Sequence, residues 1–383
     1  MALDPGEMIR TLDDYGLTGV PTETEYPQGT DGWDSYPVPW DDVLVNDRQF
    51  NDRSVDENQD ANEPPGSWSA TGQVIREIAG QRAHVPPPPD VDALAWYLPF
   101  HYFGLDWGIY VKEHSVLEIA AAIYLQMGKP HMTAKLSEDL CRMSLTVLYL
   151  HEAFHHKVES FATRLEIATL TPVYRSYKDN VVKVVRNTDS HLEEAVACAE
   201  MLIRLDEVAY KKGVENRTRQ ATKRFLQVWI PQLNPGYRLG LEHLSDESKW
   251  ILQSQVAEGT DTPTRSFTDW ALADNMLRGF FDKDAIAYVI VPVGAKPIVP
   301  WLHAVDPLVS ISTDRLIRHL RRDFGYVEVS RRGKGGHRWF EHPSGHRPSF
   351  PLPANRESLS PVVLRNVAAA LGYQSIRELA ANC

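Results

Sequence analysis

Apolar residues recur every three or four positions through the middle of the chain, which is the period of an amphipathic α-helix. The series runs from Leu140 to Leu165 through Met143, Val147, Leu150, Phe154, Val158 and Phe161. It predicts one long helix that ends before Thr171, because a residue directly ahead of a proline disfavours the helical conformation. Shorter patterns predict three further helices and two buried strands, at about 71–79, 115–127 and 190–212 and at 108–111 and 285–293. We therefore expect a mainly helical α+β protein.

The chain divides into segments of different composition. Residues 1–66 hold sixteen acidic and three basic residues, a net charge of −13, and lack an apolar period, so we expect an irregular acidic head. Residues 67–90 combine a short helix with the proline-rich linker HVPPPPD. A compact core is predicted for 91–212 and a mostly helical extension with one strand for 213–305. Residues 308–383 hold twelve Lys/Arg against six Asp/Glu, which gives this tail a charge of +6.

Cysteine usage and hydropathy favour a protein of the cytoplasm. Cys141, Cys198 and Cys383 are far apart and form no Cys-x-x-Cys pair, which argues against a disulfide framework or a cysteine zinc knuckle. The first residues lack the basic and apolar regions of a secretory signal, and no stretch approaches the roughly eighteen apolar residues of a membrane span. We expect a cytoplasmic protein without a membrane partner.

The long predicted helix carries the sequence HEAFHH, in which His151 and His155 are four positions apart. Residues at this spacing lie on one helix face about one turn apart, as two ligands of a single zinc ion must. Glu152 falls beside them, where its carboxylate can reach a water molecule at the metal. His156 points further round the helix and is not expected to be a ligand. The motif predicts a site for one zinc ion per chain.

A third zinc ligand is expected from SHLEEAVACAEML, which offers Glu193 and Glu194. Ser190 and Glu193 have the spacing of a helix capping box, which gives Glu193 a structural task. Glu194 instead shares its helix face with apolar residues such as Ala197 and Met201. A carboxylate buried there without a partner would cost several kcal/mol, and a metal ion is the obvious partner. Glu194 is therefore the predicted third ligand.

HEAFH, followed 39 residues after its last histidine by EEAVA, resembles the gluzincin class of zincin metallopeptidases. The similarity covers roughly Trp96 to Lys212, and the third ligand of that class is a glutamate on a later helix. The resemblance implies that Glu152 is the general base and proton shuttle of peptide-bond hydrolysis. It also implies that a strand edge before the helix holds an extended peptide or protein substrate.

Peptide hydrolysis needs a hydrogen-bond donor for the oxyanion that develops on the substrate carbonyl. Tyr174 and His191 are the main candidates, beside Tyr177, although His191 could equally be an exposed residue of the first helical turn. Glu159, four residues after His155, either orients a ligand histidine or pairs with a nearby cation.

The basic tail combines a Gly-x-His-x-x-Phe strand at 335–340, a Pro-x-Gly turn at 342–345 and a closing helix in LSPVVLRNVAAALGY. Over about 70 residues it resembles the HicA family of small ribonuclease toxins, which implies the α-β-β-β-α fold of double-stranded-RNA-binding domains. The catalytic histidine of that family corresponds to His337. Two features differ from the family, because Gly-Gly-His replaces Gly-Ser-His and Ala354 and Asn355 stand where many members have a second histidine.

The residues around this histidine are basic and suit contacts with RNA phosphates: Arg331, Arg332, Lys334 and Arg338. Trp339 or Phe340 either stacks on a base or fills the core of the domain.

These motifs predict a zinc-dependent metallopeptidase with a C-terminal HicA-like module that binds RNA or an antitoxin-like partner protein. By analogy alone, the combination suggests a prokaryotic toxin–antitoxin or defence setting. The alternative is a HicA-like ribonuclease toxin whose N-terminal region is regulatory. A third interpretation, a non-catalytic binding scaffold, requires that neither histidine motif is active.

Overall fold

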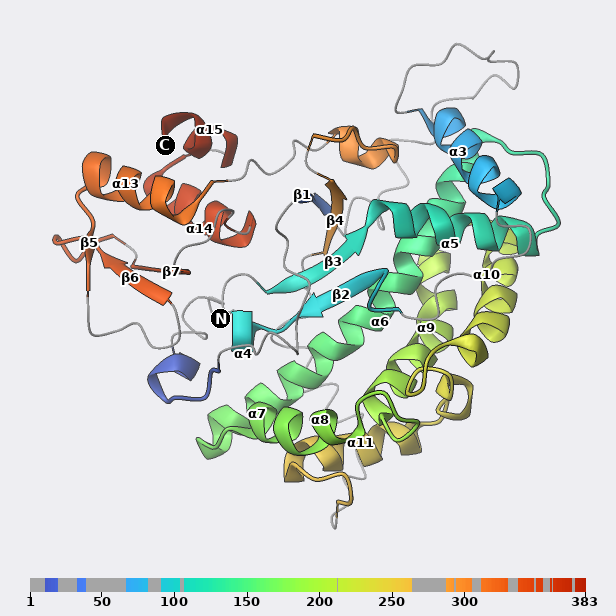
Figure 1. Cartoon of the computed structure of the whole chain (residues 1–383), viewed down its shortest axis with the longest axis horizontal. Helices are drawn as coiled ribbons and strands as arrows, with labels where there is room; N and C mark the ends of the chain where they lie inside the picture. The colour runs from blue at the N-terminus through green and yellow to red at the C-terminus, as the bar shows by residue number, and fades with distance from the viewer. Residues whose placement is uncertain are drawn as a thin grey trace.

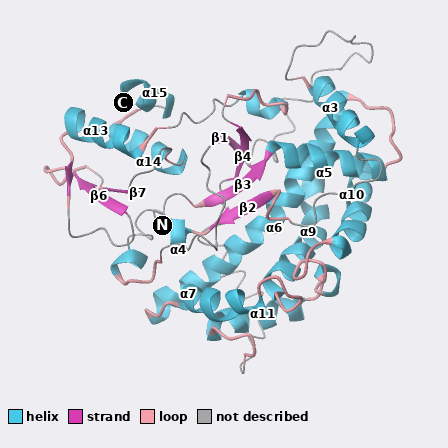
Figure 2. Ribbon diagram, in the orientation of Figure 1, coloured by secondary structure: helices cyan, strands magenta, loops and turns pink. Residues whose placement is uncertain are grey.

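The computed structural model describes most of the chain in separate ranges (Figure 1). They are 11–19, 33–38, 67–81, 91–103, 107–211, 213–263, 287–292, 294–304, 311–329, 337–347, 349–353, 359, 361–373 and 376–383. Within these ranges the fold is α+β, with helices dominant and the strands gathered into two separate sheets (Figure 2). The predicted fold class is confirmed at this level.

The first sheet has four strands in the order β1-β4-β3-β2. The strands are β1 (Trp33–Val38), β2 (Ala95–Leu98), β3 (Gly108–Lys112) and β4 (Ala287–Pro292). β3 and β4 run parallel to each other, and the edge strands β1 and β2 each run antiparallel to their neighbour. The apolar runs that predicted β3 and β4 are buried almost throughout, as expected of central strands.

The described helices that surround this sheet lie between residues 68 and 258. They are α3 (Trp68–Gln81), α4 (Phe100–Phe103), α5 (Glu113–Gln126), α6 (Ala134–Thr169), α7 (Val173–Tyr177), the π-helical turn η2 (Lys178–Val182), α8 (Lys183–Val185), α9 (Leu192–Lys211), α10 (Asn216–Trp229) and α11 (Asp246–Glu258). α6 packs along α9 and also contacts β2 and β3, so it lies between the sheet and the later helices (Figure 1).

Helix α6 spans 36 residues and confirms the helix predicted from the apolar series. The Thr133 side chain caps its first turn by accepting a hydrogen bond from the Leu136 N–H. Its end is fixed by Leu170, which adopts a left-handed conformation two residues before Pro172. The middle of the helix is buried on nearly all faces because the sheet covers one side and α9 another.

The acidic head contributes a strand to the sheet, which corrects the expectation of an irregular segment. Trp33–Val38 pairs antiparallel with Ala287–Pro292, and Tyr36 and Val38 are buried. Pro37 is tolerated because β1 is an edge strand, where one side of the backbone needs no partner. The linker at 84–90 and most of the head lie outside the described residues.

The C-terminal part forms a second unit around an antiparallel sheet of order β5-β6-β7. Its elements are α13 (Thr313–Phe324), β5 (Val327–Glu328), β6 (His337–Glu341), β7 (Phe350–Pro353), α14 (Pro361–Leu371) and α15 (Ile376–Asn382). The predicted α-β-β-β-α order is present, with α15 added after it. Trp339 and Phe340 are buried, so of the two roles considered for them they fill the core.

In the described ranges, no helix has both the length and the apolar character needed to cross a membrane.

Candidate metal centre

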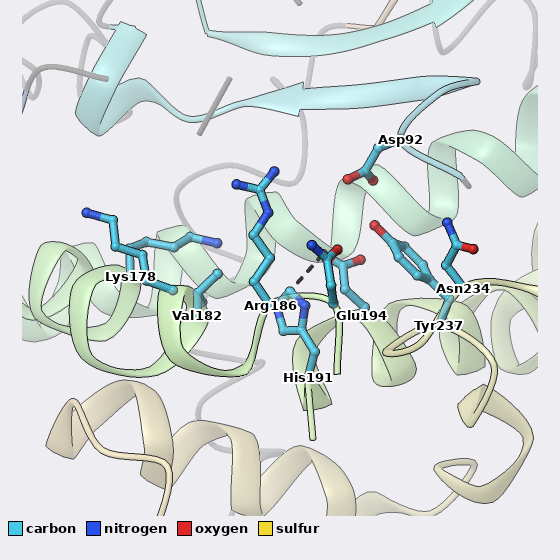
Figure 3. A pocket seen from close by; sticks show the side chains of 10 residues that line it. Asp92, Lys178, Val182, Arg186, His191, Glu194, Asn234 and Tyr237 are labelled. Atoms are coloured by element: carbon cyan, nitrogen blue, oxygen red, sulfur yellow. Dashed lines mark ion pairs between the residues drawn. The ribbon is translucent and has the colours of Figure 1, made fainter. Parts of the chain in front are cut away.

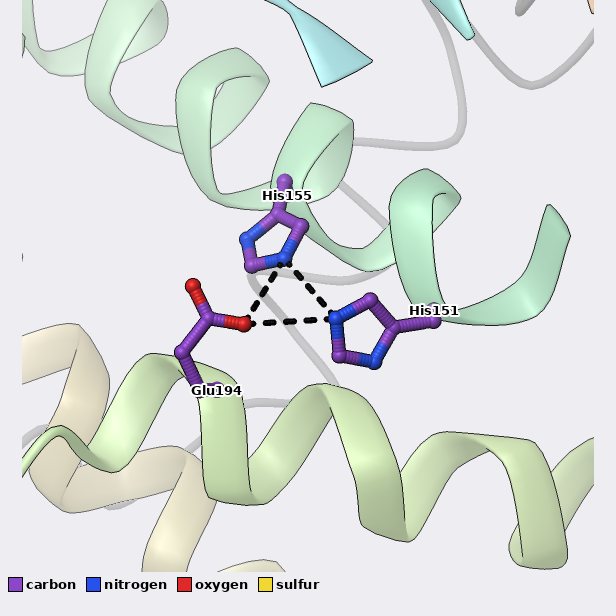
Figure 4. A group of neighbouring side chains, drawn as sticks. All are labelled: His151, His155 and Glu194. Atoms are coloured by element: carbon purple, nitrogen blue, oxygen red, sulfur yellow. Dashed lines mark hydrogen bonds and ion pairs between the residues drawn. The ribbon is translucent and has the colours of Figure 1, made fainter. Parts of the chain in front are cut away.

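Helices α6 and α9 bring together the three predicted zinc ligands, His151, His155 and Glu194 (Figure 4). The Oε2 atom of Glu194 lies 3.2 Å from Nε2 of His151 and 3.3 Å from Nε2 of His155. The two Nε2 atoms are 3.4 Å apart. All three side chains are buried or nearly so, and their ligand atoms point toward one common centre.

This triangle of atoms has the size of one face of a zinc coordination tetrahedron. Ligand atoms bound to a tetrahedral zinc at about 2.0–2.1 Å are about 3.4 Å from one another. The observed separations of 3.2–3.4 Å match that value and are long for hydrogen bonds. The Oε2 atom of Glu194 is buried without a hydrogen-bond partner, as a metal-ligand oxygen would be. The three residues therefore fit a zinc ion, with the fourth coordination position left over.

Glu193 supports the site from behind His155. Its Oε1 atom accepts a hydrogen bond from Nδ1 of His155 at 2.8 Å, which places the proton on Nδ1 and leaves the Nε2 lone pair for a metal. The Tyr177 hydroxyl donates to Oε2 of Glu193 at 2.8 Å, and Lys178 lies 3.3 Å from the same atom. The predicted capping box is wrong, because α9 begins at Leu192 and both Glu193 oxygens are engaged at the metal centre.

His151 has a different outer partner. The Cys198 Sγ atom lies 3.8 Å from its Nδ1 atom, one turn along α9 from Glu194. Sulfur is a weak hydrogen-bond acceptor, so this contact orients the ring less firmly than Glu193 orients His155. The ring of Tyr237 stacks on His151 with centroids 5.8 Å apart and supplies a second restraint.

The histidines and carboxylates of this group shift one another's pKa values. Burial lowers the pKa of His151, which keeps this imidazole neutral and able to bind a metal. Burial would also lower the pKa of His155, but the carboxylates of Glu194 and Glu193 raise it well above its ordinary value. Despite burial, His155 and His151 hold the pKa of Glu194 well below its usual range. The buried carboxylates of Glu193 and Glu194 are stabilised by a nearby positive charge, which a proton on His155 or a metal ion can supply.

Glu152 lies between His151 and His155 on α6 and is 1% exposed. Its carboxylate accepts a hydrogen bond from the backbone N–H of Tyr97 in β2, while its Oε1 atom has no hydrogen-bond partner. Burial raises the pKa of Glu152 well above its ordinary value, and the nearby negative charges of Asp92 and Glu194 add to this. A buried carboxylate with one unengaged oxygen is suited to accept and return a proton.

A pocket of about 180 Å³ opens beside Glu194 (Figure 3). His191 and Tyr237 line it, and Nε2 of His191 lies 4.0 Å from Oε1 of Glu194. His191 is 7% exposed, so the alternative of an exposed first-turn residue does not hold. Tyr174 does not line this pocket, since its ring packs on His101 with centroids 4.7 Å apart. The geometry therefore favours His191 over Tyr174 as oxyanion donor.

Two pocket residues were missed by the sequence analysis, Asp92 and Tyr237. An oxygen of Asp92 lies within 4.8 Å of ligand atoms of both His151 and Glu152. Figure 3 shows the Tyr237 hydroxyl directed into the pocket on the same side as Asp92. The available signals were weak: Asp92 follows a proline run, and Tyr237 follows Asn-Pro-Gly in a loop. Neither position belongs to a periodic pattern.

A second histidine–carboxylate cluster lies further along α6. Nδ1 of His101 is 2.7 Å from Oε1 of Glu159, and Nε2 is 2.6 Å from Oε2 of Glu166. Burial would lower the pKa of His101, but these two carboxylates raise it to about 9. Glu159 therefore pairs with a cation and does not orient a ligand histidine. His156 hydrogen-bonds the Tyr97 hydroxyl at 2.8 Å, in agreement with its exclusion as a ligand.

The predicted nucleic-acid site can be placed only in part. His337 begins β6 and pairs with Pro353, while Arg331, Arg332 and Lys334 lie outside the described residues. The Arg338 guanidinium makes two hydrogen bonds to Glu328, at 2.8 and 2.7 Å, and Arg321 binds the same carboxylate. One predicted phosphate contact is therefore engaged within the protein.

The chain matches no model of a known protein family, no curated protein and no solved structure in the comparisons made.

Proposed function

We propose that the chain is a zinc-dependent metallopeptidase that hydrolyses a peptide bond at the centre formed by α6 and α9. The observation that carries the proposal is the triangle of His151, His155 and Glu194 ligand atoms, 3.2–3.4 Å apart, with buried Glu152 beside it and a pocket open to one ligand. A cluster of histidines held only by hydrogen bonds would need neither ligand-atom separations of this size nor a pocket beside Glu194.

Each residue takes a role from its contacts. His151, His155 and Glu194 hold one zinc ion, and Glu193 keeps the His155 proton on Nδ1. When bound, zinc supplies a Lewis acid that polarises a peptide carbonyl and lowers the pKa of water.

Glu152 takes the proton from the attacking water and passes it to the leaving amine nitrogen. His191 is the oxyanion donor that the pocket favours, and Tyr237 adds a hydroxyl on the side where Asp92 lies.

The edge strand β2 follows Asp92 of the pocket and contacts Glu152 through its backbone. An extended peptide that pairs with this edge would bring its carbonyls to the metal centre.

The C-terminal unit is proposed to be a HicA-like module that binds RNA or an antitoxin-like protein. Its element order, α13, three antiparallel strands and α14, supports the proposal. Ribonuclease activity through His337 stays a prediction, as do the cytoplasmic location and the toxin–antitoxin setting. The alternative of a ribonuclease toxin with a regulatory N-terminal region also stays a prediction. The Arg338–Glu328 pair engages one predicted phosphate contact within the protein, so it supports neither RNA binding nor RNA cleavage.

The peptidase proposal is tested with a mixed peptide library and mass-spectrometric detection of cleavage by the zinc-loaded chain. Glu152→Gln keeps the size of the side chain but removes the base, so cleavage should fall roughly 100-fold or more while zinc content stays at the wild-type level. Equal cleavage by Glu152→Gln and wild type would refute the role of Glu152. No cleavage of any library member by the wild type would count against the peptidase itself.

A further inference from the structure

The pocket beside the metal centre is lined mainly by charged and polar side chains. Three of them are cations, Lys178, Lys183 and Arg186, and all come from the short segment formed by η2, α8 and the turn that follows. The anions of the lining are Asp92 and Glu194. With Glu194 assigned to the metal, the lining holds three cations and one anion. Two of these cations also pair with carboxylates outside the lining, Lys178 with Glu193 and Lys183 with Asp179. The side of the pocket formed by the three cations is therefore suited to an anionic group.

The three cations are engaged to different degrees. Lys178 is 3.3 Å from Oε2 of Glu193 and only 13% exposed, so its charge is shared with the residue that supports His155. Lys183 pairs with Asp179 one turn earlier, and both side chains are about half exposed. Exposed pairs of this kind contribute little and exchange readily for another carboxylate. Lys183 can therefore turn to a ligand at little cost.

Arg186 is the cation best placed to hold a ligand. It is exposed at the turn after α8, and Figure 3 shows its side chain extending up from the helices on the side of the pocket away from Asp92. A guanidinium offers paired N–H donors that match the two oxygens of a carboxylate. Asp92 lies on the other side of Glu194 in that view, so the cationic and anionic ends of the pocket are distinct.

From this charge distribution we infer that the pocket selects a substrate carboxylate close to the scissile bond, with Arg186 and Lys183 as the specificity-determining residues. The carboxylate is supplied by an Asp or Glu side chain or by the C-terminus of a peptide. The inference rests on the proposed peptidase function, because the metal centre is what places the scissile bond next to the pocket. A basic side chain at the same position would meet like charges and be rejected.

The test measures the affinity of peptide hydroxamates for the zinc-loaded full chain by calorimetry, since the hydroxamate group chelates zinc without being hydrolysed. Four probes share one backbone: C-terminal amides that carry Asp, Asn or Lys, and the Asn peptide with a free C-terminal carboxylate. We expect a carboxylate-bearing probe to bind roughly tenfold more tightly than the Asn amide, and the Lys amide to bind most weakly. An advantage for only one of the two carboxylate probes identifies the side chain or the terminus as the source.

Charge-removing variants locate the selectivity. Arg186→Gln and Lys183→Gln alter exposed side chains, and each should reduce severalfold the ratio of carboxylate-probe affinity to Asn-amide affinity. Lys223→Gln removes a cation of α10 that pairs with Asp206 outside the pocket, so it should leave the selectivity intact.

Equal affinities of all four probes for the wild type would overturn the carboxylate inference and leave the peptidase proposal standing. A carboxylate advantage that persists unchanged in both pocket variants would overturn the assignment to Arg186 and Lys183. Failure of every hydroxamate to bind the zinc-loaded chain would overturn the peptidase site and this inference with it.

Discussion

Helix α6 contributes side chains to two buried histidine–carboxylate clusters that differ in how their polar atoms are satisfied. In the cluster of His101, Glu159 and Glu166, both histidine nitrogens lie 2.6–2.7 Å from carboxylate oxygens, the distance of charge-assisted hydrogen bonds. In the cluster of His151, His155 and Glu194, the atoms lie 3.2–3.4 Å apart. Hydrogen bonds satisfy the polar atoms of the first cluster, whereas the separations in the second are those of a metal site.

The surroundings of the two clusters differ in the same sense. Glu159 accepts further hydrogen bonds from the Tyr97 hydroxyl and from the backbone N–H groups of Phe100 and His101. Glu194, by contrast, has an oxygen without a hydrogen-bond partner and borders a pocket. A buried group of histidine and glutamate side chains is therefore insufficient evidence for a metal centre. A ligand oxygen without a hydrogen-bond partner and a pocket that opens beside it distinguish the candidate metal site from the hydrogen-bonded cluster.

The largest expected effect comes from removing the histidine of the hydrogen-bonded cluster. His101→Leu leaves Glu159 and Glu166 buried without their cation, which should lower the free energy of unfolding by about 3–5 kcal/mol in urea titrations. Zinc content per folded chain should not change. His114→Ala is the control, because His114 is 72% exposed and pairs only across one helical turn with Glu118. Loss of zinc from His101→Leu at wild-type stability would contradict the division between the clusters.

The hydrogen-bonded cluster should also make stability depend on pH. The pKa of His101 is raised to about 9 in the folded protein, against 6.5 for an ordinary histidine. The resulting stabilisation, about 3 kcal/mol, is complete below pH 6.5 and is lost as the pH rises through 9. The difference in unfolding free energy between wild type and His101→Gln should therefore shrink across this range. A constant difference from pH 6 to 9.5 would show that His101 is not held as a cation.

A smaller effect, on zinc affinity, is expected from replacing Glu193, which hydrogen-bonds the proposed ligand His155. Glu193→Ala removes the acceptor that fixes Nδ1–H of His155 and should weaken zinc binding about 10–100-fold in competition with a chelating indicator. Glu193→Gln keeps an acceptor oxygen and should fall between this variant and wild type. Glu200→Gln is the matched control, because Glu200 is also buried on α9 but pairs with Lys157 and Lys249. Equal zinc affinities of the wild type and the three variants would refute the role of Glu193 in zinc binding.

The elements predictable from sequence are those with local signals. The apolar series from Leu140 to Leu165 predicted α6, and the unpartnered position of Glu194 on an apolar face predicted that it would approach the two histidines. These inferences needed only the period of a helix and the cost of burying a charge.

The features that were missed depend on contacts between distant segments. β1 pairs with a strand more than 240 residues away, and Asp34 and Pro37 obscure its apolar pattern. Glu193 contacts His155 because of how α9 is rotated against α6, which the sequence does not show. The spacing of Ser190 and Glu193 instead predicted a helix cap, and that prediction was wrong. His101 gave no signal because both of its carboxylate partners lie on another helix.

Zinc content per chain tests the central claim most directly. Purified wild-type protein, His155→Ala and His101→Leu are dialysed against the same zinc buffer and measured by plasma mass spectrometry after removal of unbound metal. We predict about one zinc per folded chain for the wild type and for His101→Leu, and almost none for His155→Ala. Full zinc retention by His155→Ala would contradict the assignment of His151, His155 and Glu194 as a metal centre.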